Sequence, residues 1–388
     1  MMESPIYLDH ATTTGPSDYL VQQMQPFFKR HWHCPTAPYL KGKEPFATIN
    51  QKIRKIKTSL GAGEKDTFVL TSCAAEAISH IYHALAIDEA SETGKNHFVT
   101  TFIEDASFLM GINRFEALGI QKKLSPLNNQ GVLTPENLMR TLTPRTSLVS
   151  LSWANGLTGI LHPIAELAEV CKEKGVAFHV DVSDILGKLY FRFEDLPIDY
   201  LTFDGDRFHG PKGTGGLLIR HPHTLSPLIP DGTQQHGLRG GTLNLPGLVG
   251  LGIAFEEQEE HFNHVCMETA RLRNHFETSI ESALSEAQVL FREISRLPNV
   301  SVIAFPGVTS ELLAFHLAQQ DVFASFGGGR HQKLPALLET IGIDPDIAKC
   351  ALSFSLGRGT TQEEIQRAVG IVADTAAKCR TFSKKVKV

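Results

Sequence analysis

Short apolar runs alternate with longer helical patterns over the first 220 residues, and this alternation constrains the fold most. The runs expected to be buried strands are residues 68–71, 97–101, 147–152, 176–181, 200–203 and 216–220. Helical patterns fall between several of them, at residues 74–86, 107–118 and 163–174. Strands and helices that alternate at these lengths form a mainly parallel sheet covered on both faces. The sequence therefore predicts an α/β domain.

The pattern changes after residue 245. A long helical stretch at about residues 246–290 is followed by a strand at 300–305, a helix at 311–319, and strands at 321–326 and 350–355. A capping box, Thr361 with Glu364, predicts the start of a closing helix. Because 388 residues exceed the roughly 250 to 300 that one core usually serves, we predict two domains. Residues 16–245 form a large α/β domain, and residues 1–15 and 246–388 a smaller α+β domain with a long connecting helix.

Composition excludes several classes of function. With 37 basic and 42 acidic residues, the formal charge of -5 gives no general attraction to nucleic acid or anionic membranes. No apolar run approaches the roughly 20 residues that span a bilayer, and the N-terminus lacks a signal-peptide pattern. Six cysteines without a CxxC pair argue against a zinc site and a disulfide framework, so we expect a cytoplasmic protein without a metal.

One motif follows the strand at 200–203: Asp204-Gly205-Asp206-Arg207-Phe208-His209-Gly210-Pro211-Lys212-Gly213. It resembles the Ser-Gly-His-Lys-x-x-Gly-Pro-Lys-Gly signature of pyridoxal-phosphate enzymes of the class V aminotransferase fold, in particular the NifS/IscS-like cysteine desulfurases. Further segments resemble that family in the same order: Tyr7-Leu8-Asp9, Thr71-Ser72-Cys73-Ala74-Ala75-Glu76, His179-Val180-Asp181, Leu238-Arg239-Gly240-Gly241-Thr242 and Ser353-Phe354-Ser355-Leu356-Gly357-Arg358. Together they imply the two-domain fold of PLP-transferases.

The resemblance also implies roles for single residues. The positions that hold the cofactor in the family correspond here to Ala75, Asn155, Asp181, Asp184, Asp204, Asp206 and Thr242, and the position that holds the substrate carboxylate corresponds to Arg358. Because the loop from Arg239 to Thr242 reaches the partner's active site in the family, a homodimer is expected. The family also suggests an unidentified partner in sulfur metabolism or iron-sulfur assembly.

Arg207 stands where the family has the lysine that carries the cofactor as an imine. A guanidinium cannot replace that amine, because it stays protonated and has no free electron pair to attack an aldehyde. Beside it, Asp204 and Asp206 replace a serine and a histidine. A carboxylate 4 Å from a phosphate costs about 4 kcal/mol per unit-charge pair at an effective dielectric of 20. The sequence therefore predicts that pyridoxal phosphate is not bound in the usual way.

Other departures agree with this prediction. Cys73 and Ala75 replace a glycine and a threonine of the phosphate loop, and Asp105 replaces the histidine that stacks on the cofactor ring. The loop at 325–331, which carries the sulfur-accepting cysteine in the family, has no cysteine. We therefore expect a family member without pyridoxal-phosphate catalysis, acting as a binding or regulatory scaffold. The rival hypothesis is an active desulfurase or lyase with an atypical site.

Several residues have two interpretations. Asp181 either pairs with a pyridinium or is held by local donors at a strand end. Arg207 could pair with Asp181, Asp184, Asp204 or Asp206, and such an ion cluster would block the cofactor sterically. Arg239 and Arg358 either bind an anion or form structural pairs. Lys212, the family's second lysine, is expected to point away from the site.

Overall fold

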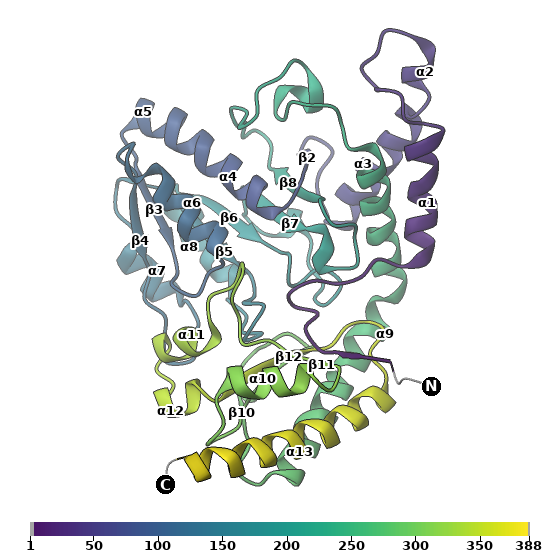
Figure 1. Ribbon diagram of the computed structural model, residues 1–388. Coiled ribbons are helices and arrows are strands. Elements are labelled where there is room, and N and C mark those ends of the chain that lie inside the picture. The colour runs from purple at the N-terminus through teal and green to yellow at the C-terminus, as the bar shows by residue number, and fades with distance from the viewer. Residues whose placement is uncertain (1–3, 387–388) are drawn as a thin grey trace.

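A computed structural model describes residues 4–386, so residues 1–3 and 387–388 of the predicted smaller domain lie outside it (Figure 1). Its largest sheet has seven strands in the order β2-β8-β7-β6-β5-β3-β4. Only β8 runs antiparallel to its neighbours. The strands are β2 (Thr67–Thr71), β3 (His97–Thr100), β4 (Gln121–Leu124), β5 (Thr146–Ser152), β6 (Ala177–Asp181), β7 (Tyr200–Asp204) and β8 (Gly215–Ile219). The mainly parallel sheet predicted from the apolar runs is confirmed.

Helices cover both faces of this sheet, because alternate residues of each strand point to opposite sides. Phe68 and Leu70 pack on one face against α1 (Asp18–Lys29), α3 (Phe46–Ser59), α8 (Ile164–Lys174) and the first part of α9 (Leu245–Ala283). Val69 packs on the other face against α4 (Ala74–Ala84) and α6 (Ala106–Glu116). The remaining helices of this region are α2 (Leu40–Lys43), α5 (Ala90–Thr93) and α7 (Pro135–Thr141).

The two ends of the chain share a second core. The strand β1 (Ile6–Tyr7) runs parallel to β11 (Val322–Phe323), and Ile6 and Leu8 pack with residues of α9 and α13 (Gln362–Val386). An antiparallel sheet, β12-β10-β9, adds β9 (Gln288–Leu290), β10 (Val300–Ala304) and β12 (Ala351–Ser355). Three helices complete this region: α10 (Ser310–Ala318), α11 (Leu334–Thr340) and α12 (Pro345–Ala348). The domain boundary after residue 245 stays a prediction.

Two predicted elements are shorter than expected. The helix expected to reach residue 290 ends at Ala283, and residues 288–290 instead form β9, which pairs with β10. The strand expected at 321–326 is limited to β11, because the backbone soon enters a run of glycines, 327–329, with positive φ. The predicted capping box is confirmed: the Thr361 amide donates to Glu364 at 2.8 Å, and the Glu364 amide donates to the Thr361 hydroxyl at 3.2 Å.

The fold brings distant segments together at the carboxyl ends of β5, β6 and β7. The loop between β11 and α11, coloured light green in Figure 1, reaches from the C-terminal part of the chain to the large sheet. Its Arg330 carbonyl accepts a hydrogen bond from the Ala106 amide at the start of α6 (2.8 Å). No helix within residues 4–386 is long and apolar enough to cross a membrane.

Candidate functional site

A cavity of about 540 Å³ lies at this end of the sheet. Ser152, Asp181 and Asp204 contribute from the ends of β5, β6 and β7, and residues 72–75 contribute from the turn after β2 and the start of α4. Ligands of open α/β sheets bind at the carboxyl ends of the strands, and cavities of this size hold small molecules. Five aspartates and two arginines line this cavity: Asp105, Asp181, Asp184, Asp204, Asp206, Arg207 and Arg330. Its charge is therefore dominated by carboxylates.

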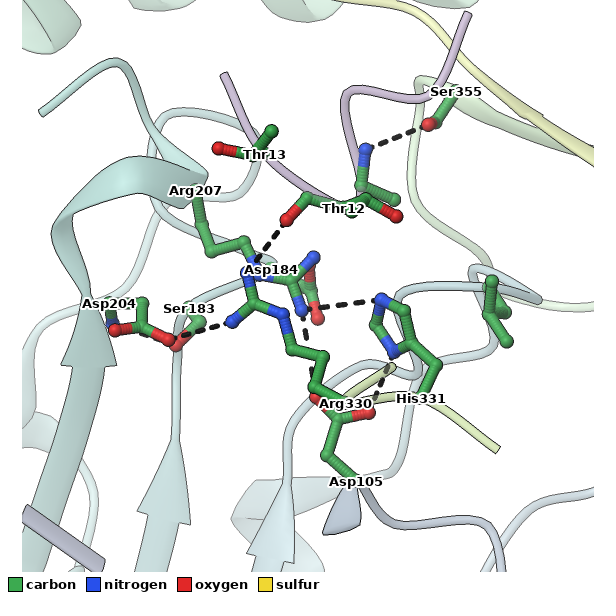
Figure 2. A network of polar contacts seen from close by, with 12 residues as sticks. Thr12, Thr13, Asp105, Ser183, Asp184, Asp204, Arg207, Arg330, His331 and Ser355 are labelled. Atoms are coloured by element: carbon green, nitrogen blue, oxygen red, sulfur yellow. Dashed lines mark hydrogen bonds and ion pairs between the residues drawn. The ribbon is translucent and has the colours of Figure 1, made fainter. Parts of the chain in front are cut away.

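Arg207 is buried at the base of the cavity, with 1% of its surface exposed. It ends a short 3-10 turn, Gly205–Arg207, that follows β7. Its Nη1 lies 3.4 Å from Asp184 Oδ1, and its Nη2 lies 3.5 Å from Asp105 Oδ2 (Figure 2). Nη2 is also 3.5 Å from His331 Nε2, whereas Nε and Nη1 have no hydrogen-bond acceptor within the described part of the chain. The buried Asp184 and the partly exposed Asp105 thus both offset the guanidinium charge.

The hypotheses about Arg207 have different outcomes. Pairing with Asp184 is confirmed, whereas the second partner is Asp105, which the sequence comparison had considered only as the replacement of a stacking ring. Among the described residues, Asp181, Asp204 and Asp206 form no ion pair with Arg207. A cavity remains beside the guanidinium, and the expected steric block of the cofactor by Arg207 stays a prediction.

Arg330 supplies the second positive charge. Its Nη1 donates to Asp204 Oδ2 at 2.7 Å, its Nη2 donates to the Thr12 carbonyl at 2.7 Å, and Nη2 lies 3.7 Å from Asp206 Oδ1 (Figure 2). The neighbouring His331 places its Nδ1 2.7 Å from Asp105 Oδ1. Sequence reasoning considered this loop only for its missing cysteine and its glycines, and it missed both side chains.

The acids are also held by backbone and hydroxyl donors. Asp204 Oδ1 accepts from the Ala74 amide at the N-terminus of α4 (2.8 Å), and Asp206 Oδ2 accepts from the Thr13 hydroxyl (2.9 Å). The helix N-terminus is a favourable place for an anion, because its amides lack partners within the helix. Here a carboxylate of the protein itself takes up that position.

Burial and neighbouring charges set the pKa values of these acids. Burial raises the pKa of Asp204, and the Arg330 guanidinium opposes that shift only in part. Burial also acts to raise the pKa of Asp105, but His331 and Arg207 outweigh it, so the pKa of Asp105 is lowered. Asp105 is therefore ionised at neutral pH and can pair with Arg207.

Asp181 terminates a buried chain of polar groups. The Thr202 hydroxyl donates to Asp181 Oδ2 (2.6 Å) and lies 2.8 Å from His179 Nε2. His179 Nδ1 in turn contacts the Ser150 hydroxyl (2.7 Å), which contacts the Tyr82 hydroxyl (2.7 Å). Asp181 Oδ1 accepts from the Ser183 amide at 2.9 Å. These contacts agree with the local-donor interpretation of Asp181, and burial raises its pKa to about 7.

Two of the family-equivalent positions do not line the cavity. The Asn155 side chain is used within its own turn, where it donates to the Ile103 carbonyl and accepts from the Leu157 and Thr158 amides. Thr242 is exposed and lies outside the residues that line the cavity. Ala75, in contrast, does line it. Asn155 and Thr242 thus do not face the cavity of their own chain, and the cofactor-binding roles that the resemblance implies stay predictions.

The two anion-binding candidates are both paired. Arg358 Nη2 donates to Glu257 at 2.9 Å, and Arg239 Nε donates to Glu76 at 2.8 Å. Arg358 lines a separate cavity of about 40 Å³, which Arg207 also borders. The structural-pair interpretation of both arginines agrees with these contacts, and the role of Arg358 with a substrate carboxylate stays a prediction.

Two amines and one thiol complete the surroundings. Lys212 is exposed, as expected, whereas Lys188 places its Nζ 3.4 Å from the Arg207 carbonyl oxygen in the smaller cavity. Burial lowers the pKa of Lys188 to about 8. Cys73 lines the main cavity and is half-buried. Within residues 4–386 there is no group of three or more histidine, cysteine, aspartate or glutamate side chains that could hold a metal.

Comparisons with known proteins agree with the arrangement of the fold. The family model described as aminotransferase class-V matches residues 6–368. A cysteine desulfurase of Bradyrhizobium diazoefficiens is 32% identical over 98% of this chain and 97% of its own length. The cysteine desulfurase IscS of Dictyoglomus turgidum is 29% identical over 98% and 97%. A solved structure of a NifS-like protein has a TM-score of 0.89 at 29% identity, covering 96% of this chain and 100% of its own.

Proposed function

Because the chain belongs to the class V aminotransferase family, we propose that it is a cysteine desulfurase-like member that has lost pyridoxal-phosphate catalysis and acts as a binding or regulatory scaffold. The observation that carries this proposal is the buried ion cluster around Arg207, which takes the place of the imine-forming amine. A fold alone does not decide a function, so the proposal rests on the chemistry of the site.

This position lacks the amine that would attach the cofactor covalently. An imine forms when a neutral amine attacks an aldehyde, and the guanidinium of Arg207 has no such electron pair. Its positive charge is further stabilised by Asp105 and Asp184. The residues present therefore do not fit pyridoxal phosphate bound as an imine at this position.

The position that the cofactor phosphate would occupy is also unfavourable for an anion. The Ala74 amide, at the N-terminus of α4, already donates to Asp204, and Asp206 lies in the same cavity. A phosphate dianion there would compete with a carboxylate for the amide and would be repelled by both acids, at about 4 kcal/mol per unit-charge pair 4 Å apart and an effective dielectric of 20. We infer that the aldehyde and the phosphate of the cofactor are both disfavoured.

The loop that supplies the sulfur-accepting thiol in the family has none here. The loop that carries a cysteine in the desulfurases carries Arg330 and His331 here, and both side chains are engaged with acids of the cavity. Cys350 is buried and therefore cannot serve as a mobile acceptor of sulfur. Three separate requirements of the chemistry are thus unmet: the amine that forms the imine, a favourable position for the phosphate, and the thiol of the loop. The proposal therefore does not depend on a single substitution.

The rival function is an active pyridoxal-phosphate desulfurase or lyase with an atypical site. The open cavity and the position of Asp181 at the end of β6 favour it. The two are separated by incubating the purified protein with pyridoxal phosphate, recording the absorbance of the imine and measuring sulfide release from cysteine. The scaffold predicts neither signal, and a clear signal in both assays would establish the rival.

We further infer that the protein is a homodimer and that its partners belong to sulfur or iron-sulfur metabolism. Large apolar side chains are exposed on α1 and on the segment that follows it: Tyr19, Phe28, Trp32, Tyr39 and Leu40. Exposed apolar groups clustered in one region are typical of protein contacts. Sedimentation analysis should give twice the chain mass of 42.7 kDa, and a monomer at micromolar concentration would contradict the dimer.

A further inference from the structure

We propose that residues 325–333, here called the strap, are fastened to the rim of the cavity by a latch at Arg330. The strap belongs by sequence to the C-terminal part of the chain, yet its side chains contact acids at the end of β7 and at the start of α6 (Figure 2). The inference rests on these contacts alone and does not depend on the proposed loss of cofactor chemistry.

Backbone contacts join the two ends of the strap, whereas packing does not fix the conformation of its middle. Residues Gly327 and Lys333 form an isolated antiparallel bridge, and the Leu334 amide donates to the Phe326 carbonyl at 2.8 Å. Gly328 and Gly329 have positive φ and open space around them, so their conformation is not fixed by packing. The middle of the strap is therefore held mainly by what its tip contacts.

Most contacts of the tip are made with residues of the large α/β region, and one is made with the N-terminal segment. Besides its bonds to Asp204 and the Thr12 carbonyl, Arg330 accepts a backbone hydrogen bond from the Ala106 amide at 2.8 Å. The adjacent Gln332 donates its side-chain amide to the Phe102 carbonyl and, at 3.2 Å, to the Glu104 carbonyl. Opening the strap requires that these bonds break together.

Arg330 is the strongest of these contacts. Hydrogen bonds between a guanidinium and a carboxylate are about twice as strong as those between neutral groups. Arg330 also neutralises a cavity in which carboxylates outnumber guanidiniums, so its removal leaves Asp204 and Asp206 facing each other without a cation. The latch is thus electrostatic, and because the Arg330 side chain is 31% exposed, dissolved salt can weaken it.

The Ala106 amide provides a direct measure of opening, because its hydrogen bond is made to the strap. In the full-length protein, Arg330→Gln should raise the hydrogen-exchange rate of this amide by at least about tenfold, corresponding to roughly 1.4 kcal/mol, measured with overlapping peptides that cover residues 102–112. Alkylation of Cys73, followed by mass spectrometry, should accelerate in parallel. The matched control is Arg292→Gln, which removes the same charge from an exposed side chain that pairs with Glu281 and, at 3.7 Å, with Glu277.

The outcomes separate the latch from general destabilisation. Unchanged exchange at Ala106 in the Arg330 variant would overturn the proposal, and so would an equal increase in the Arg292 control. If the Arg330 variant does not fold, the wild-type protein decides: raising the salt concentration from about 0.01 to 1 M shortens the Debye length from about 30 to 3 Å and should accelerate exchange at Ala106. Salt-independent exchange there would contradict an electrostatic latch.

Discussion

Nη1 of Arg207 lies 3.4 Å from Oδ1 of Asp184, and both side chains are buried. Removing one partner of a buried ion pair leaves an uncompensated charge, which typically costs about 3 to 5 kcal/mol. Arg207→Met should therefore lower the free energy of unfolding by an amount in that range, measured by urea denaturation at pH 7. Arg271→Met, which breaks an exposed pair with Glu268, should cost less than about 1 kcal/mol. Equal costs for the two variants would contradict a structural role of the cluster.

Restoring the amine alone should not restore the cofactor. Arg207→Lys supplies a nucleophile, but Asp204 still accepts the hydrogen bond of the Ala74 amide and still repels a phosphate. We expect no imine absorbance for this single variant, and absorbance for the triple variant Arg207→Lys, Asp204→Ser and Asp206→His. The pair Asp204→Ser and Asp206→His without the lysine is the control. A single lysine variant that binds the cofactor tightly would show that the two acids are a weaker obstacle than proposed.

Asp181 should make the stability depend on pH. Its folded-state pKa, about 7, lies above the ordinary value of 3.8, so the folded protein holds the proton more tightly. This contribution is complete below about pH 4 and is lost as the pH rises through 7. Asp181→Asn removes this titration. As the pH rises from 4 to 8, the free energy of unfolding of this variant should therefore increase by on the order of 4 kcal/mol relative to that of the wild type. A difference in stability that is constant over this range would mean that Asp181 is not buried as an acid.

The hydroxyl of Thr202 should contribute more to the stability of the fold than its methyl group. Thr202→Val removes the donor to Asp181 and the contact with His179, which leaves buried polar atoms without partners at a cost of about 1 to 3 kcal/mol. Thr202→Ser keeps the hydroxyl and should cost less, as measured by urea denaturation at pH 5, where Asp181 is protonated. If the valine variant were as stable as the serine variant, the polar chain would contribute little to folding.

Periodicity was sufficient to predict the large sheet, because each buried strand is a short apolar run and each covering helix repeats its apolar residues every three to four positions. It missed β4, whose sequence Gln121-Lys122-Lys123-Leu124 is polar because the strand lies at the sheet edge. It also extended the connecting helix over β9, since a three-residue strand has too few residues for a period. Short or edge strands depend on pairing partners that a local pattern does not contain.

The candidate site was predictable in position but not in pairing. The motif around Arg207 identified the cluster of acids, because an unusual cation and several new carboxylates occur together in the sequence. The partners were harder to foresee, because Asp105 lies about a hundred residues before Arg207, and Arg330 lies more than a hundred residues after Asp204. Each pair meets only through the fold. Arg358 illustrates the same limit: its partner, Glu257, lies on α9, which no motif connects to it.

The most direct test of the central claim is covalent. The protein is incubated with pyridoxal phosphate, reduced with borohydride, digested and analysed by mass spectrometry, which detects a pyridoxyl group on any lysine. Lys188, whose amine lies beside Arg207 with a lowered pKa, is the residue to examine most closely, and the exposed Lys212 serves as a reference for non-specific labelling. We predict no pyridoxyl group at Lys188 and none above the Lys212 background elsewhere. Stoichiometric modification of Lys188 would contradict the proposal that this chain has lost its cofactor.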